Sequence, residues 1–217
     1  MKKLFFFALF LLLFSGFIYA QTTVSVDLQK NSWLTIRGTT NVISFRLVHE
    51  GEKLLGKKIT VTTTQNKNKI FTSQNQLSIA VKNFTSENGM ARRDFLKLIK
   101  SEAYPNLEVQ LNYIETLPGK EKDRYARGNA FVNITITGVT KQYLIPVFSN
   151  QLGEFISVDG GKKINIQDFG LEPPVEMLGL IKVSEWINID FHMVCKLTVS
   201  KDTQTKSNLA LNIIEPK

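Results

Sequence analysis

The sequence predicts an all-β fold, an antiparallel barrel in which one α-helix is embedded. Three observations support this prediction. Apolar and polar residues alternate along most of the chain after residue 20, as in strands that bury one face. One alternating segment, Ile187 to Val199, is long enough to suit a strongly tilted barrel strand. One segment, Met90 to Ser101, instead shows the spacing of an amphipathic helix.

Four shorter segments show the same alternation. Alternate side chains of a strand point to the same face, so each apolar set should share the inner face of a strand. The sets are Ile43, Phe45 and Leu47; Leu77, Ile79 and Val81; Leu107, Val109, Leu111 and Tyr113; and Ala130, Val132, Ile134 and Ile136. Glycines, among them Gly138, Gly153 and the Gly160–Gly161 pair, are expected to punctuate the strands.

The last segment carries the only cysteine. Ile187, Ile189, Phe191, Met193, Cys195, Leu197 and Val199 fall on one face, and His192 falls on the other. Cys195 has no partner in the chain, so a disulfide scaffold is excluded. Its place on the apolar face indicates a core residue rather than a nucleophile.

The predicted helix places Ala91, Phe95, Leu98 and Ile99 on one stripe. It should end before Tyr104, because the residue that precedes a proline disfavours helical backbone. The polar segment from Lys120 to Arg127 is expected to form an exposed hairpin loop. No linker divides the chain, so residues 21–217 are predicted to form a single domain.

The first twenty residues have the pattern of a secretory signal peptide. Lys2 and Lys3 precede an apolar run from Leu4 to Phe14, and Ala20 suits the last position before cleavage. The alternative, a membrane anchor, is disfavoured because the apolar run is short for a bilayer. We therefore expect residues 1–20 to be removed after Ala20 and the protein to be periplasmic or secreted.

The mature chain should be mildly basic. Removing Lys2 and Lys3 takes the net charge from +8 to +6. The basic residues are spread along the chain without the interleaved aromatic residues that stack on bases, and export also argues against nucleic acid as a partner. Solvated surface is the simpler explanation for them, and contact with an anionic membrane surface is the functional alternative.

Residues for catalysis or metal binding are scarce. His49 and His192 are the only histidines, and they lack the spacing of a metal site. The sequence has no glycine-rich phosphate loop and no serine elbow. We expect no metal, no cofactor and no catalytic residue, and so a protein that is not an enzyme.

Four blocks of sequence, in order, resemble the YceI-like family. They are Ser44-Phe45-Arg46-Leu47-Val48-His49 followed by Gly56; Ala103-Tyr104-Pro105-Asn106-Leu107 after the helix; Ile136-Thr137-Gly138-Val139-Thr140-Lys141; and Asp168-Phe169-Gly170-Leu171. The third block is the most specific of them. The resemblance covers most of the mature chain, from about Trp33 to Val199.

The resemblance implies a lipocalin-like, extended antiparallel barrel whose interior holds a long-chain lipid, which is a polyisoprenoid in some relatives. Physical argument agrees, because a barrel of about eight strands is just wide enough to hold one small ligand. Each buried methylene group contributes about 0.8 kcal/mol, so tight binding needs no catalytic residue.

The predicted ligand-binding residues are mostly apolar positions of the alternating segments. Plain core packing is the competing explanation for each, since cavity-facing and core-facing residues share the same alternation. Arg93, Lys141 and Asp168, near motif ends, are expected to meet a polar headgroup. The full set is Phe45, Leu47, Ile79, Val109, Leu111, Ile134, Ile136, Phe169, Phe191, Arg93, Lys141 and Asp168.

A different function class stays open beside lipid binding. The chain could be a structural or stress-related envelope protein whose barrel is filled by side chains and which acts through surface contacts. The apolar segment from Pro173 to Ile181 distinguishes the two functions. If it folds over a cavity it favours lipid binding, and if it is exposed as a contact patch it favours action through surface contacts. A homodimer also stays open.

Overall fold

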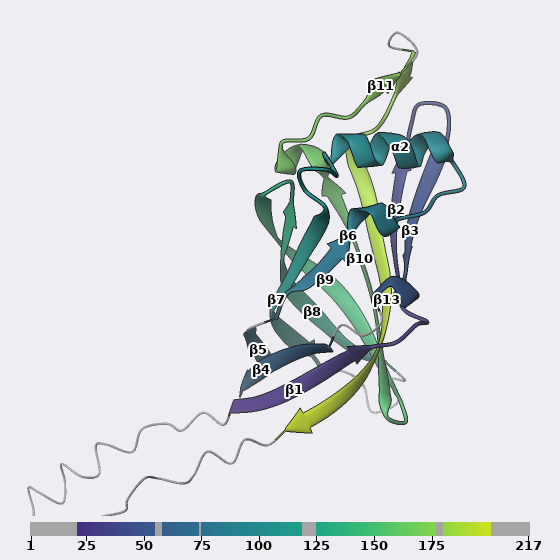
Figure 1. The fold of residues 1–217 in the computed structure, drawn as a ribbon. Coiled ribbons are helices and arrows are strands. Elements are labelled where there is room, and N and C mark those ends of the chain that lie inside the picture. Colours follow the sequence, from purple (N-terminus) through teal and green to yellow (C-terminus); the bar gives the residue numbers. More distant parts are fainter. Residues whose placement is uncertain (1–20, 55–57, 74, 119–124, 177–179, 201–217) are drawn as a thin grey trace, which may run out of the picture.

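Alternation of apolar and polar side chains folds most of the chain into one antiparallel sheet that curls into a barrel, with α2 lying across one end (Figure 1). The computed structural model describes residues 21–54, 58–73, 75–118, 125–176 and 180–200. Residues 1–20 and 201–217, and most of the predicted loop from Lys120 to Arg127, lie outside these ranges.

The described elements follow one another along the chain. They are β1 (Gln21–Leu28), β2 (Trp33–Thr39), β3 (Ser44–Glu50), η1 (Gly51–Leu54), β4 (Lys58–Asn66), β5 (Lys69–Ser73), β6 (Leu77–Ala80), η2 (Val81–Asn83), α2 (Gly89–Leu98), β7 (Asn106–Leu117), β8 (Ala126–Ile136), β9 (Val139–Leu152), β10 (Phe155–Asn165), η3 (Ile166–Phe169), β11 (Val175–Glu176), β12 (Ile181–Lys182) and β13 (Trp186–Ser200).

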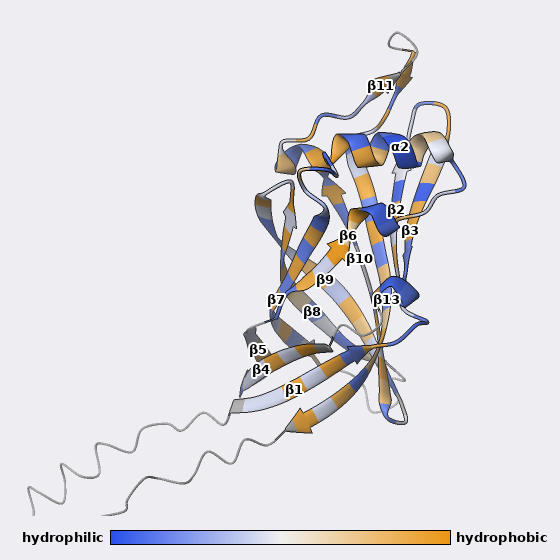
Figure 2. Cartoon of the chain, viewed as in Figure 1, coloured by the Kyte–Doolittle hydropathy of each residue, from blue (hydrophilic) through white to orange (hydrophobic). Residues whose placement is uncertain are grey.

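The long strand β13 closes the barrel. One of its edges pairs with β10, while the other pairs first with β2 and then, from Cys195 to Ser200, with β1. Because β1 continues through β4 and β5 to β7, the strands β1, β4, β5, β7, β8, β9, β10 and β13 form a closed ring. The predicted barrel with an embedded helix is confirmed, and Figure 2 shows the alternation of hydrophobic and hydrophilic residues along its strands.

At the α2 end of the barrel, helices fill the space between β3 and β6. Two backbone hydrogen bonds of 2.8 Å join Val48 of β3 to Thr85, which follows η2, because the N–H of each residue donates to the carbonyl of the other. The fully buried Phe84 packs edge-on against Phe95 of α2, with ring centroids 5.3 Å apart. The Arg92 guanidinium donates to the Phe84 carbonyl at 2.8 Å, and this hydrogen bond holds α2 against the segment that follows η2.

The helix is shorter than the predicted segment from Met90 to Ser101. Asn88 caps its start, where the side-chain oxygen accepts from the backbone N–H of Met90 and Ala91 at 3.1 Å. It ends at Leu98, and Lys100 adopts a positive φ of 50° that a continuing helix does not allow.

The predicted inward position of Tyr113 is wrong, because β7 has an irregularity in its register between Leu111 and Tyr113. Leu111 pairs with Val132, whereas Tyr113 pairs with Phe131 and stacks on its ring at a centroid distance of 4.9 Å. The extra residue shifts the alternation by one, so Tyr113 joins Phe131 on the outer face while Leu111 lines the interior.

The buried side chain of Asn75 substitutes for a strand partner near this irregularity. It accepts from the Leu111 backbone N–H at 2.7 Å and donates to the Leu111 carbonyl at 2.8 Å. These bonds span the break between β5, which pairs with the later part of β7, and β6, which pairs with its beginning.

The prediction that glycines punctuate the strands holds at Gly138 and fails at Gly160–Gly161. Gly138, at φ 79°, forms the tight turn between β8 and β9. Gly160 and Gly161 instead lie inside β10, where the absent side chain of Gly160 leaves room for the ring of Phe191 on β13.

Candidate functional site

The interior of the barrel contains an apolar cavity of about 540 Å³. Its wall is formed by inward side chains of β1, β2, β3, β4, β6, β7, β8, β9 and β13, and by residues of α2. Strands with one inward face supply this wall because every second side chain points to the barrel axis. The cavity therefore follows directly from the alternation in the sequence.

The strand β13 contributes the longest part of the wall. Ile187, Ile189, Phe191, Met193 and Cys195 all line the cavity, as the shared face predicted. Leu197 and Val199 continue the alternation but are exposed, because they lie beyond the cavity at the end of the strand. Cys195 thus faces the cavity, where it is partly buried, rather than a packed core.

Two phenylalanine rings lie against the barrel wall over glycines on neighbouring strands. Phe45 of β3 pairs with Gly38 of β2, and Phe191 of β13 pairs with Gly160 of β10. A Cβ atom on either glycine would collide with the facing ring. The two glycines therefore let the rings lie along the wall and keep the cavity wide.

Most of the predicted site residues line the cavity. Val109 and Leu111 do so from β7 and Ile134 and Ile136 from β8, in keeping with their alternation. The predicted residues that line it are Phe45, Leu47, Ile79, Val109, Leu111, Ile134, Ile136 and Phe191. Their role in binding a ligand stays a prediction.

The other four predicted residues lie elsewhere. Phe169 is fully buried outside the cavity wall, beside Tyr143 with ring centroids 6.2 Å apart. Arg93 is exposed on α2, and Lys141 is exposed on β9. Asp168 is exposed and accepts a hydrogen bond from the Tyr143 hydroxyl at 3.2 Å. The structure does not bring these charged groups together around the cavity.

Some lining residues were not predicted from the sequence. Val26 of β1 and Ile59 of β4 come from a part of the chain in which no face was assigned, although Val24, Val26 and Leu28 do alternate. Met90 and Phe95 come from α2. The spacing of apolar residues in this segment predicts a helix with one apolar face, but only the fold shows that this face covers one end of a cavity.

Asp94 of α2 is the only charged residue among the described residues that line the cavity. Its side chain is 19% exposed, and Nε of the neighbouring Arg93 lies 3.8 Å from one of its carboxylate oxygens. The cavity thus presents one carboxylate and no lysine or arginine to a ligand.

The uncharged polar side chains of the lining are engaged with the protein. Asn75 and Asn88 hold backbone groups, as described above. Thr40 Oγ1 accepts from the Ile43 N–H at 2.9 Å, and Ser184 Oγ accepts from the Trp186 N–H at 3.1 Å. Gln76 donates to the Glu108 carboxylate at 3.0 Å. Apart from the Asp94 carboxylate, the described lining therefore presents mainly hydrocarbon groups to a ligand.

The thiol of Cys195 is a poor nucleophile at neutral pH. Burial, together with the nearby carboxylate of Asp27, raises its pKa to about 11. The thiolate is the nucleophilic form of cysteine, and only a small fraction of Cys195 is in that form at neutral pH. This agrees with the prediction that Cys195 is not a catalytic nucleophile.

The two histidines belong to separate packing arrangements. His49 is fully buried against Phe84, with ring centroids 5.1 Å apart. His192, on the outer face as predicted, stacks on Trp33 and lies 2.7 Å from an Asp159 carboxylate oxygen through Nδ1. No group of three or more potential metal ligands occurs among the residues that the structure describes.

A family model of the YceI-like domain matches residues 20–195, which is most of the chain. The chain belongs to the YceI-like family. The match includes α2 and the strands of the closed ring, β13 as far as Cys195, so the resemblance seen in the four sequence blocks is confirmed. A comparison with curated proteins finds no match.

Solved structures share the fold of this YceI-like protein at low identity. A polyisoprenoid binding domain from Saccharophagus degradans, implicated in plant cell wall breakdown, is 12% identical with a TM-score of 0.55; the match covers 83% of this chain and 99% of that domain. BcnA of Burkholderia cenocepacia is 15% identical with a TM-score of 0.52, over 77% and 99% of the two chains. Within the described part of the chain, no helix is long and apolar enough to cross a membrane.

Proposed function

We propose that this YceI-like protein binds a long-chain apolar molecule, a polyisoprenoid or another lipid, inside its barrel. The observation that carries the proposal is the apolar cavity of about 540 Å³ within the closed ring of strands. Its volume lies within the range of about 300–1,000 Å³ that is usual for small-molecule sites. The polyisoprenoid binding domain from Saccharophagus degradans, which shares the fold, supports this choice of ligand class.

The energetics of the cavity suit a ligand held by its chain. Burial of about ten methylene groups at about 0.8 kcal/mol each supplies about 8 kcal/mol. That is the scale of micromolar binding before the costs of ordering are subtracted. Specific contacts to a headgroup are not required, in keeping with a binding role rather than catalysis.

The charges at the cavity favour a ligand with an uncharged head. A phosphate or carboxylate headgroup would meet the Asp94 carboxylate, because the described lining has no lysine or arginine and the neighbouring Arg93, although 3.8 Å from that carboxylate, is exposed outside the lining. Like charges repel, and the effect grows where water is scarce. A long-chain alcohol, amide or quinone is therefore preferred over a fatty acid or a prenyl phosphate.

Export is part of the proposal. Residues 1–20 have the pattern of a signal peptide, and the family match begins at residue 20. The domain of residues 21–217 would then act in the periplasm or outside the cell. Cell fractionation and N-terminal sequencing test this, with Gln21 expected as the first residue of the exported protein. An uncleaved protein in the cytoplasmic fraction would contradict it.

The binding proposal is tested by organic extraction and mass spectrometry of protein purified from cells that express the full sequence. We expect about one neutral lipid per protein molecule. Val109→Phe places a larger side chain in the cavity and should reduce the bound lipid at least fivefold. Gln110→Phe, at the next position on the outer face of β7, should leave it unchanged.

Two results would overturn the binding proposal. One is wild-type protein that carries no lipid and takes up no long-chain alcohol from solution. The other is an equal lipid content in both variants while circular dichroism and thermal melts show that both are folded. The alternative function, through a barrel filled by side chains, has less support because the described interior contains the cavity.

A further inference from the structure

Exposed apolar side chains gather around the α2 end of the cavity. We call five of them the mouth rim: Val42 and Ile43 in the turn between β2 and β3, Met90 at the start of α2, and Val175 and Leu180 in the hairpin of β11 and β12. Their exposed fractions are 68%, 52%, 54%, 58% and 72%. In Figure 1, β11 lies beyond α2 at the end of the barrel that carries the β2–β3 turn.

Hydrogen bonds hold the hairpin against the β2–β3 turn. The Asn41 side chain donates to the Leu180 carbonyl at 2.9 Å and accepts from the Lys182 N–H at 3.0 Å. The Asn41 backbone N–H donates to the Lys182 carbonyl at 3.2 Å. Val42 and Leu180 therefore belong to one surface rather than to two independent loops.

The mouth rim is continuous with the cavity. Val42, Ile43 and Met90 line the cavity and are also more than half exposed. Pro174 and Ile181 line it from the hairpin. An apolar surface thus runs from the interior of the barrel to the solvent at this end, without a charged barrier other than Asp94.

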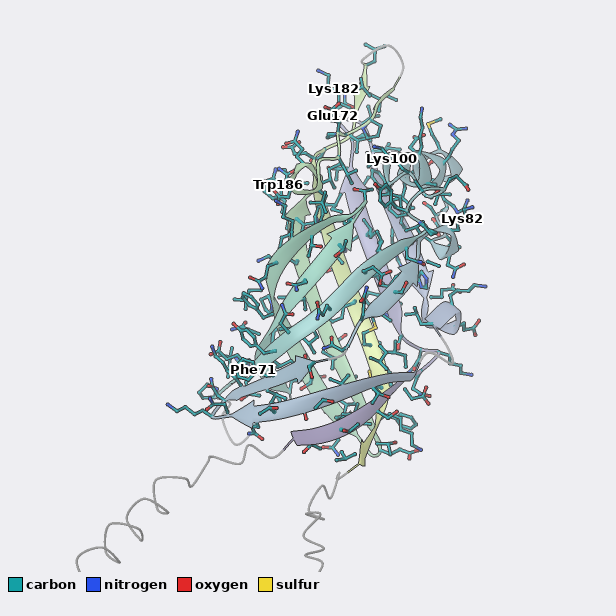
Figure 3. The ribbon with its side chains drawn as sticks, turned by 60° about the vertical axis from the view of Figure 1, so that its left-hand side comes forward. Phe71, Lys82, Lys100, Glu172, Lys182 and Trp186 are labelled. Atoms are coloured by element: carbon teal, nitrogen blue, oxygen red, sulfur yellow. The ribbon has the colours of Figure 1, made fainter. Side chains whose placement is uncertain are left out.

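The charges beside the mouth rim have both signs. Figure 3 shows Lys182 of β12, Glu172 and Lys100, which follows α2, at this end of the barrel. Arg93 is 72% exposed on α2. Mixed charges around an apolar centre fit the headgroup zone of a lipid bilayer, in which ammonium and phosphate groups are mixed, and do not require an anionic partner.

We propose that the mouth rim docks on the surface of a lipid bilayer, so that an apolar ligand passes between membrane and cavity without crossing water. This rests on the proposed function. A bilayer is the favoured occupant because the rim continues into a site for lipid, and because an apolar surface of this kind marks an interaction site. The start of β1 and the end of β13 lie at the opposite end of the barrel (Figure 1), so the described ends of the chain do not lead into the mouth rim.

Vesicle flotation with phosphatidylcholine vesicles tests the docking surface. The variant Val175→Asp/Leu180→Asp places two charges on the rim at residues that do not line the cavity. It should float with the vesicles at least fivefold less than wild type. The matched control Leu144→Asp/Phe148→Asp alters two exposed residues of β9, 41% and 48% exposed, and should change flotation less than twofold.

Salt and self-association complete the test. Raising the salt concentration from 0.1 M to 0.5 M should change wild-type flotation less than twofold, because apolar insertion is not screened. Binding that requires anionic vesicles and is lost at 0.5 M would overturn the proposal. So would a rim-dependent dimer in ultracentrifugation that does not float with vesicles, since the rim would then face a second copy.

Uptake of a long-chain alcohol from solution, without vesicles, separates this proposal from the proposed function. The rim variant should take up the alcohol as wild type does, because its altered residues lie outside the cavity. If neither wild type nor the rim variant takes up the alcohol, the proposed function fails, whatever the flotation experiment shows. If uptake is normal and wild type does not float, only the docking proposal fails.

Discussion

Gly160 faces Phe191 across the β10–β13 pair so closely that a Cβ atom on Gly160 would lie 2.5 Å from Phe191 Cζ. The same added atom would lie 3.1 Å from Val147 Cγ1. The glycine thus leaves the space that the ring occupies on the inner wall. Cavity width in this protein depends on a residue that contributes no side chain to it.

Gly160→Ala should therefore narrow the cavity. The new methyl group displaces the Phe191 ring toward the barrel axis, at a cost to stability of about 1–3 kcal/mol for overpacking. We expect at least a threefold loss of long-chain alcohol binding, measured by titration, and a lower melting temperature. Gly89→Ala is the matched control, because a Cβ atom there meets nothing within 4 Å. Equal losses in both variants would refute the role of Gly160.

Asp94→Asn should change the preference for the headgroup. Removing the carboxylate removes the repulsion of an anionic head, so binding of a long-chain fatty acid should improve at least threefold at pH 7. Binding of the alcohol with the same chain should stay within twofold of wild type. Competition titrations give the ratio of the two affinities. An unchanged ratio would show that Asp94 does not act on the headgroup.

Asn41→Ala should loosen the hairpin of β11 and β12. It removes the two side-chain bonds to Leu180 and Lys182, and the expected cost is about 1–2 kcal/mol. Hydrogen exchange at the Lys182 N–H should become faster. Asn41→Asp keeps the acceptor for that N–H and loses the donor to Leu180, so it should show an intermediate rate. Equal exchange rates in all three proteins would contradict this assignment.

Asp168→Asn should lower the pKa of Tyr143. Burial is the first cause that raises this pKa to about 12, followed by the charge of Asp168 and the hydrogen bond to it. A nearby negative charge disfavours the phenolate, so its removal should shift the pKa back toward 10. Absorbance titration of the tyrosines, with Tyr143→Phe to identify the signal, measures the shift. A pKa that stays near 12 would leave burial as the sole cause.

The closed barrel was predictable because the alternation in the last strand extends over its whole length. From Ile187 to Cys195 the inward residues are those expected, since β13 pairs regularly with β10. The prediction for Tyr113 is wrong because a shift in register leaves the apolar pattern intact while it turns the side chain outward. Nothing local in the sequence marks that shift.

The headgroup residues show a different limit of sequence reasoning. The positions of Arg93, Lys141 and Asp168 near motif ends predict contact with a headgroup, but a position within a motif does not fix the direction of a side chain. Asp94, the neighbour of Arg93, is the residue that lines the cavity. On a helix adjacent residues point about 100° apart, so only the packing of α2 decides which of them faces inward.

Cys195 provides the most direct measurement of the central claim, because it is the single cysteine and it lines the cavity. Its pKa of about 11 means that alkylation of lipid-free protein should accelerate about tenfold per pH unit between pH 8 and pH 10. At pH 9, a saturating long-chain alcohol should slow alkylation at least tenfold, whereas ethanol should not. Equal rates with and without the long-chain alcohol, despite the presence of bound alcohol, would contradict a ligand inside the barrel.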